Sequence, residues 1–205
     1  MLQGDADEYC LLCHGIADAK GLHAGLCAAG GDRTVRHNAV RGYVFEFARK
    51  AGLRPELEKA DLLLPARPDD LEKERRRPAD VFLPRWLGGG PAALDFAITS
   101  PHRQDVLTKA ASEDLAAASD YEGTKRSFLN TEQECSLVGL RFLPVVGETT
   151  GAWGSVASTL FAQLARAAAT ETGAPVAKLH SELLQGLSVR VRRARARAVL
   201  KRAFL

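Results

Sequence analysis

The stretch RRRPADVFLPRWLGGGPAALDFAITSP, residues 75–101, contains two short apolar runs, and each run carries one aspartate. The runs ADVFLP and ALDFAITS have the composition of strands, and the GGGP between them is typical of a turn. Because side chains alternate across a strand, Asp80 shares a face with Phe82, and Asp95 shares a face with Ala97. The stretch therefore predicts two neighbouring strands that each carry a carboxylate.

These aspartates need compensation, because an unpaired carboxylate near the interior of a sheet is costly. One interpretation is structural: Asp80 caps a turn beside the arginines, and Asp95 pairs with an arginine. The other is functional: two aspartates on strands joined by a short turn can converge at one end of a hairpin, where Mg²⁺ would bind the pair. Pro68 and Asp69 form a competing element, but no apolar strand follows them, so we favour Asp80.

A lysine near such a metal would orient the attacking water and offset the charge that develops on a phosphate. The residue two positions after Asp95 is Ala97, so no lysine stands there. A helix predicted over residues 104–134 offers Lys109 and Lys125 instead. Helical spacing places Lys125 on the apolar stripe of this helix and points Lys109 away from it. The stripe consists of Leu107, Ala110, Ala118, Tyr121 and Phe128.

Helices and strands alternate along the rest of the chain. A helix is predicted from Arg36 to a C-cap at Gly52, and a strand is predicted to end at Pro65. The run LVGLRFLPVV predicts another buried strand, which is followed by a helix from about Ser155 to Thr172 and by a final helix. The predicted fold class is α/β, with the core order helix, three strands, helix, strand, helix.

We divide the chain into three parts: an N-terminal segment over residues 1–35, a core over residues 36–175 and a basic C-terminal helix over residues 176–205. The N-terminal segment is rich in Cys, His, Gly and Ala and has neither a clear helix period nor a clear strand period. We therefore expect a small unit there that needs a cross-link to hold it together.

Three cysteines and a histidine in this segment have the spacing C-x₂-C, nine residues, then H-x₃-C. Thiolates with one imidazole form the ligand set of structural Zn²⁺. The alternative is a segment with incidental thiols. His14 is too close to its neighbouring cysteine to be the favoured ligand, and we expect Cys135 to be a small core residue. The predicted zinc ligands are Cys10, Cys13, His23 and Cys27.

The net charge is only +3, but basic residues accumulate after Glu182, the last acidic residue. Such a tail suits a polyanionic partner, and a solvated helix is the alternative. The chain lacks an apolar run long enough to cross a bilayer and a signal-peptide pattern, so we expect a nuclear or cytoplasmic protein that is not secreted. The candidate nucleic-acid contacts in the tail are Arg190, Arg192, Arg193, Arg195 and Arg197.

The combination of CLLC…H…C, GGDRTVRHNAVRGYVFEFARKAGL, RRPADVFL, ALDFAITSP and YEGTKRSF resembles the restriction-like endonuclease region of site-specific non-LTR retrotransposons. It is similar in layout to the wider PD-(D/E)xK nuclease superfamily, and the resemblance covers residues 10 to about 150. The resemblance implies that Asp80 and Asp95 bind the catalytic metal and that Lys125 is the lysine, relocated to a helix. The sequence departs from the pattern at Ala79, which splits the proline from the aspartate, and at Ala97.

The resemblance also implies a nuclease with catalytic Mg²⁺ and structural Zn²⁺ that nicks target DNA and exposes a 3′-hydroxyl for reverse transcription. Its partners would be DNA, the RNA of the parent element and a reverse transcriptase portion. No polymerase motif is visible, so the chain would be a fragment, a relic or a domesticated copy of such an element. The alternative is a catalytically inactive nucleic-acid-binding module with the same fold.

Five further residues have a structural and a functional interpretation. Arg36 and His37 open the first predicted helix, where phosphate contacts and plain solvent exposure are both compatible with the pattern. Glu46 on that helix could add a third carboxylate to the metal site, although a solvated helix face is favoured. Glu148 could line the cleft, although a loop is the default, and Trp153 is expected to pack at the start of the next helix.

Overall fold

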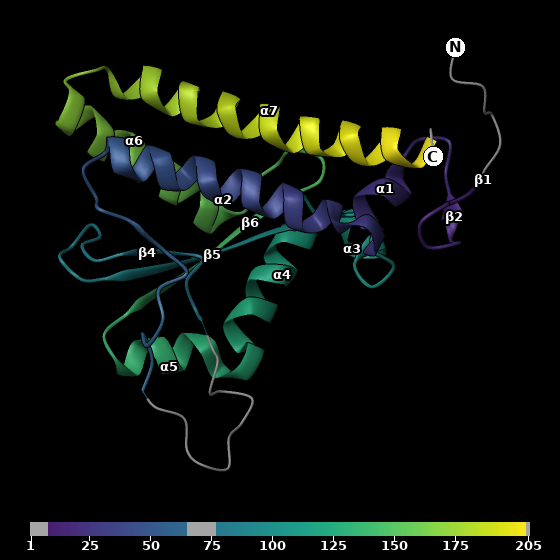
Figure 1. Cartoon of the computed structure of the whole chain (residues 1–205). Coiled ribbons are helices and arrows are strands. Elements are labelled where there is room, and N and C mark those ends of the chain that lie inside the picture. Colours follow the sequence, from purple (N-terminus) through teal and green to yellow (C-terminus); the bar gives the residue numbers. More distant parts are fainter. Residues whose placement is uncertain (1–7, 65–76, 204–205) are drawn as a thin grey trace.

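A four-stranded mixed sheet with helices on both of its faces forms the centre of the molecule (Figure 1). The computed structural model describes residues 8–64 and 77–203. The strand order is β3-β4-β5-β6, with antiparallel pairing except between β5 and β6, which are parallel. The strands are β3 (Glu56–Leu57), β4 (Val81–Leu83), β5 (Ala92–Thr99) and β6 (Arg141–Glu148). The α/β class predicted from the sequence is confirmed.

One face of the sheet packs against α2 (Asp32–Lys50) and α6 (Ser155–Thr172), and α7 (Val176–Ala203) lies across these two helices (Figure 1). This side holds the larger core, to which alternate residues of β5 contribute Leu94 and Phe96. The opposite face carries a smaller cluster around Phe82, Phe142 and Cys135. Cys135 is fully buried, as predicted.

Three of the predicted helices are confirmed. The first ends as expected, because Gly52 adopts the left-handed φ of +70° that favours glycine. α6 has the predicted bounds and stops at Gly173, which also has a positive φ. α7 turns an apolar face inward, with buried Leu187, Val191, Ala194 and Ala198. Among the described helices, none combines the length and apolar character that a bilayer span requires.

The strand expected to end at Pro65 is much shorter than predicted. Of the predicted strand, only the two residues of β3 join the sheet, where they pair with β4; the chain then leaves the sheet, with positive φ angles at Glu58 and Asp61. Such angles are incompatible with a continuing strand. Leu62 and Leu63 of the apolar run that follows β3 pack against the smaller core cluster. The apolar character of this run therefore reflects burial in the core and not pairing in the sheet.

The single helix predicted over residues 104–134 is wrong, because the chain breaks twice within that segment. It forms α3 (Leu107–Ala110), α4 (Ala116–Ser127) and α5 (Thr131–Leu137). Left-handed backbone angles at the residues between them stop each helix. These residues are Leu115, Leu129 and Asn130.

The two breaks also change which side chains face the core. Leu107 and Phe128, the two ends of the predicted stripe, are 48% and 65% exposed. Ala118, in the middle of the stripe, is fully buried as expected. Residues on either side of a break no longer share one helix face, so the predicted stripe is correct only within α4.

The N-terminal segment, whose sequence has neither a clear helix period nor a clear strand period, forms a short antiparallel hairpin followed by a helix. The hairpin consists of β1 (Glu8–Tyr9) and β2 (Ile16–Ala17), and the helix is α1 (Leu22–Leu26). Elements this short fall below the length at which a hydrophobic period is visible in the sequence. The competing Pro68–Asp69 element lies outside the described residues.

The end of α7 is tied to the start of α2 by a buried ion pair. Arg202 Nη1 lies 2.8 Å from Asp32 Oδ2, and the two side chains are 4% and 5% exposed. Arg202 also donates to the carbonyl of Ala29, and Lys201 donates to the carbonyl of Gly30 over 2.7 Å. These contacts hold the C-terminal helix against the N-terminal segment, so the two ends of the described chain meet (Figure 1).

We expect Arg202→Met to lower the free energy of unfolding by about 3–5 kcal/mol, because Asp32 would remain buried without its counter-charge. Urea denaturation at neutral pH measures this change. Arg197→Ala, an exposed arginine on the same helix, is the control and should change stability by less than about 0.5 kcal/mol. Equal stability of the two variants would contradict the importance of the pair.

Candidate functional site

Asp80 and Asp95 lie next to each other across β4 and β5. In the antiparallel register Val81 faces Leu94, so one further step places Asp80 opposite Asp95. The Asp80 N–H continues the ladder by donating to the Leu94 carbonyl over 2.9 Å. The two carboxyl groups are close enough for Asp80 to contribute to a raised pKa of Asp95. The convergence that the hairpin predicted therefore occurs in the structure.

Asp80 is held by a backbone donor and by a histidine. Its Oδ2 accepts a hydrogen bond of 2.7 Å from the Phe96 N–H, and its Oδ1 lies 3.3 Å from Nε2 of His37 on α2. Burial raises the pKa of Asp80, but the hydrogen bond and the charge of His37 lower it. The Phe96 N–H and the charge of Lys125 act in the same direction, so the pKa lies below its ordinary value.

Asp95 is paired with a lysine from α4. Lys125 Nζ lies 2.7 Å from Asp95 Oδ2. Burial raises the pKa of Asp95 to about 6, because the attraction of Lys125 offsets only part of that cost, and the neighbouring Asp80 adds to the rise. Neighbouring carboxyl groups with pKa values shifted in opposite directions are a recurring feature of acid–base sites.

The broken helix still delivers Lys125 because α4 is anchored at its beginning. Glu148, the last residue of β6, is 6% exposed and accepts a hydrogen bond of 3.2 Å from the Ala118 N–H in the first turn of α4. A carboxylate is favourable at this end of a helix dipole. The loop assigned to Glu148 by default is wrong, and the residue positions α4 without reaching the aspartates through any described contact.

Two hollows meet at Lys125. One is lined by Asp95, Pro78 and Phe128, and the other by residues of α1, α2 and β5, including Arg36 and His37. Tyr121 and Lys125 line both. Of the two residues that open the first predicted helix, His37 contacts Asp80 and Arg36 is buried, so neither lies on a fully solvated surface.

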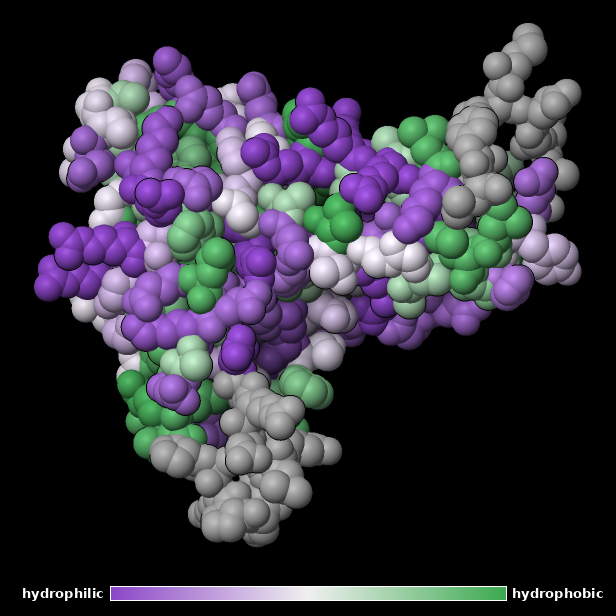
Figure 2. All heavy atoms as spheres, viewed as in Figure 1, coloured by the Kyte–Doolittle hydropathy of each residue, from purple (hydrophilic) through white to green (hydrophobic). Residues whose placement is uncertain are grey.

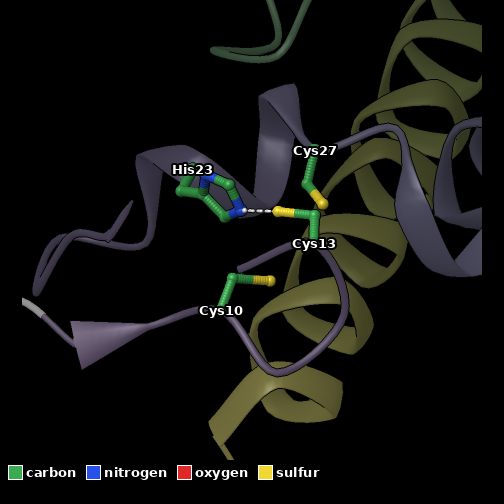
Figure 3. A group of neighbouring side chains, drawn as sticks. All are labelled: Cys10, Cys13, His23 and Cys27. Atoms are coloured by element: carbon green, nitrogen blue, oxygen red, sulfur yellow. Dashed lines mark hydrogen bonds between the residues drawn. The ribbon is translucent and has the colours of Figure 1, made fainter. Parts of the chain in front are cut away.

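The four predicted zinc ligands converge in the N-terminal unit (Figure 3). Cys10 and Cys13 lie at the turn between β1 and β2, His23 lies on α1 and Cys27 follows that helix. The four ligand atoms lie within 4.8 Å of one another, and Cys13 Sγ lies 3.2 Å from His23 Nε2. Tetrahedral Zn²⁺ with bonds of about 2.3 Å needs a ligand separation of roughly 3.8 Å, so a small contraction completes the site.

The surroundings of this cluster favour a bound cation. Burial raises the pKa of the Cys10 thiol, but the backbone N–H groups of Leu12 and Cys13 outweigh it. Hydrogen bonds from the His23 and Cys13 side chains add to the effect, and the pKa falls to about 6. The thiolate, which is the form that binds zinc, is thus stabilised before metal arrives.

One supporting residue of this cluster was missed from the sequence. Asp18 accepts hydrogen bonds from the backbone N–H groups of Leu22 and His23, over 3.0 and 2.6 Å, and so fixes the start of α1. The signal was present, because an aspartate just before a short helix is a common N-terminal cap. In the part of the chain that the structure describes, this Cys/His cluster is the one group of three or more side chains placed to hold a metal.

The tail arginines lie apart from the aspartate pair, and none of them lines either hollow among the described residues. Arg190 stacks on the Tyr43 ring, with 3.7 Å between guanidinium carbon and ring centroid, which gives it a structural role. Hydrophilic residues cover much of α7 in the view of Figure 2. The exposed members of the predicted set are Arg192, Arg193 and Arg197, and Arg195 is half-buried.

The remaining candidates take structural positions. Glu46 is exposed and pairs with Arg49 one helical turn away, so the favoured solvated interpretation is confirmed. Lys109 is exposed and lies 3.7 Å from Glu113, and it faces away as predicted. Trp153, just before α6, packs edge-on against the ring of Phe161 within that helix, so the expected packing role is confirmed.

Comparisons of the chain with protein-family models, with curated proteins and with solved structures found no match. The arguments for function therefore rest on the two clusters described above.

We expect purified protein to hold about one tightly bound Zn²⁺ per chain, and Cys13→Ser to lose it, because a hydroxyl is a poor replacement for a thiolate ligand. Elemental analysis after gel filtration measures the zinc content. His14→Asn is the control, since asparagine tolerates the positive φ of 59° at this position. Zinc retained by Cys13→Ser but lost from His14→Asn would show that His14 is the ligand.

Proposed function

We propose that this protein is a Mg²⁺-dependent DNA endonuclease built on a restriction-endonuclease-like core. One observation carries the proposal: Asp80 and Asp95 stand side by side on neighbouring strands, with Lys125 placed on them by a following helix. The order of helix, three strands, helical segment, strand and helix supports the same layout. The resemblance of the sequence to the endonuclease region of site-specific non-LTR retrotransposons is the second line of support.

The described residues suit a hard divalent cation, because Asp80 and Asp95 present adjacent carboxylates with low exposure. When bound there, Mg²⁺ would neutralise the scissile phosphate and lower the pKa of a water. Lys125 would stabilise negative charge that grows on the phosphate oxygens. His37 would keep Asp80 ionised and correctly turned through its contact with Oδ1.

The two departures from the family pattern concern the backbone before Asp80 and the position of the lysine. Ala79 is buried in the smaller core cluster, where a small apolar residue fits, so it need not disturb the aspartate. Lys125 contacts Asp95 from α4, which supplies the charge that Ala97 cannot supply from the strand. The proposal therefore assigns the role of the usual strand lysine to a helix.

The rival proposal is an inactive nucleic-acid-binding module, and one observation favours it. Both aspartates already have a basic partner, since His37 contacts Asp80 and Lys125 contacts Asp95. An ion-paired arrangement of this kind is stable without a metal. In either proposal, target DNA is the partner, and the N-terminal unit with the Cys/His cluster and the exposed arginines of α7 hold nucleic acid. Only in the endonuclease proposal would a reverse transcriptase portion use the nick.

We expect zinc-loaded protein to nick supercoiled plasmid only when Mg²⁺ is supplied, and Asp80→Asn or Asp95→Asn to reduce the rate by about two orders of magnitude or more. Asparagine keeps the size of aspartate and removes the charge that holds the cation. Conversion to open-circular plasmid measures the rate, and DNA binding should persist. Asp69→Asn is the control and should nick at the wild-type rate; dependence on Asp69 in place of Asp80 would move the site.

Lys125→Ala should reduce nicking by about tenfold or more, because the charge that faces the reacting phosphate is removed. Lys109→Ala is the matched control from the same segment, and its rate should equal that of the wild type. Since Lys125 also pairs with Asp95, a thermal melt of each variant should accompany the assay. Equal rates for the two variants would exclude Lys125 from the chemistry.

A further inference from the structure

A hollow of about 250 Å³ opens beside the aspartate pair and carries an unusual concentration of positive charge. Its walls come from α1, α2, β5 and α4. Because one water occupies about 30 Å³, the volume suits a phosphate group with a few ordered waters. No carboxylate lines the hollow among the described residues. Its basic lining residues are Arg33, Arg36, His37, Arg103 and Lys125.

Three of these five basic side chains contact carboxylates that lie just outside the hollow. Each has at least one described acidic partner within ion-pairing distance, so it does not need a ligand for compensation. These pairs are His37 with Asp80, Lys125 with Asp95, and Arg103 with Asp105 and Asp120.

Arg33 and Arg36 differ from the other three. In the described part of the chain neither has a carboxylate partner; both donate only to backbone carbonyls of α1, Arg33 to Leu26 and Arg36 to Gly25. Arg36 is only 5% exposed, and its Nε has no hydrogen-bond partner among the described residues. A buried guanidinium without a counter-ion is costly.

The electrostatics of α2 emphasise this imbalance. Burial lowers the pKa of Arg36, and the charge of Arg33, one helical turn away, lowers it further. Asp32 acts in the opposite direction but is itself engaged by Arg202 at 2.8 Å. Two neighbouring guanidiniums facing one hollow would be relieved by an anion placed between them.

We propose that this hollow binds a backbone phosphate of the DNA strand, next to the phosphodiester held at the aspartates. The assignment rests on the proposed function and names the substrate contact that positions the strand. Tyr121 and Lys125 line both this hollow and the one that contains Asp95, so neighbouring phosphates of one strand can occupy the two sites together. Arg33 and Arg36 hold the phosphate, and the carbonyls of Gly25 and Leu26 fix the two guanidiniums.

The test is DNA binding without Mg²⁺, so that cleavage does not enter the measurement. The probe is a short fluorescein-labelled duplex, and its anisotropy is titrated over a series of KCl concentrations with zinc-loaded wild type, Arg33→Gln and Arg36→Gln. Arg85→Gln, an exposed arginine on the β4–β5 connection outside the hollow, is the matched control. Circular dichroism melts identify any variant that fails to fold. If the buried Arg36→Gln does not fold, Arg33→Gln still tests the proposal, because Arg33 is exposed.

We expect Arg33→Gln to weaken DNA binding by about tenfold, because one charge-assisted hydrogen bond is lost. The slope of log affinity against log salt should decrease in magnitude by roughly 0.9, because one phosphate contact is lost. Arg85→Gln should bind like the wild type. If Arg33→Gln and Arg85→Gln behave alike, the proposal is overturned. A second arm replaces chloride with inorganic phosphate at equal ionic strength. If only the wild type binds phosphate, but phosphate displaces DNA equally from the wild type and from Arg33→Gln, then DNA does not occupy the hollow. The hollow would then serve free phosphate, and the proposal is again overturned.

The outcome is separable from that of the nicking assay. If Arg33→Gln lowers DNA affinity but the wild type never nicks plasmid, the phosphate site stands and the endonuclease proposal fails. If the wild type nicks plasmid but Arg33→Gln binds DNA as well as the wild type does, the endonuclease proposal stands and the phosphate site fails.

Discussion

Repulsion between two adjacent carboxylates is the constraint around which this fold is arranged. The register of β4 and β5 places Asp80 opposite Asp95, and three groups approach the pair: the Phe96 N–H, His37 and Lys125. α2 supplies the histidine and α4 supplies the lysine, so helices on either side of the sheet contribute to one site. Without these groups, the cost of burying two charges would oppose the pairing of the two strands.

The N-terminal Cys/His cluster and the C-terminal helix are connected to this site through α1 and α2. α1 carries His23 of the cluster and contributes the carbonyls of Gly25 and Leu26, which accept hydrogen bonds from the arginines of the basic hollow. Arg202 at the end of α7 pairs with Asp32 and also donates to the carbonyl of Ala29, which follows the Cys/His cluster. One contact network therefore links both ends of the described chain to the helix that bears Arg36 and His37.

The distribution of basic residues divides them into two groups with different roles. Arg33 and Arg36 face the hollow beside the aspartates, whereas the exposed arginines of α7 lie on a helix that packs over α2 and α6. A DNA strand bound in the hollow would contact Arg33 and Arg36, and the exposed arginines of α7 would contact more distant phosphates. Electrostatic contacts of the second kind give affinity and salt dependence without a fixed register.

Local spacing in the sequence was enough to predict the Cys/His cluster, the paired aspartates and the bounds of α6, because each depends on residues in one segment of the chain or on one helical period. It was wrong about the helix over residues 104–134, since left-handed residues such as Leu115 look ordinary in a sequence. It also gave no sign of the partners of Asp32 and Glu148, which come from distant segments. Only the tertiary structure decided that Arg33 and Arg36 share a hollow with Lys125, because helix packing and not sequence spacing brings those charges together.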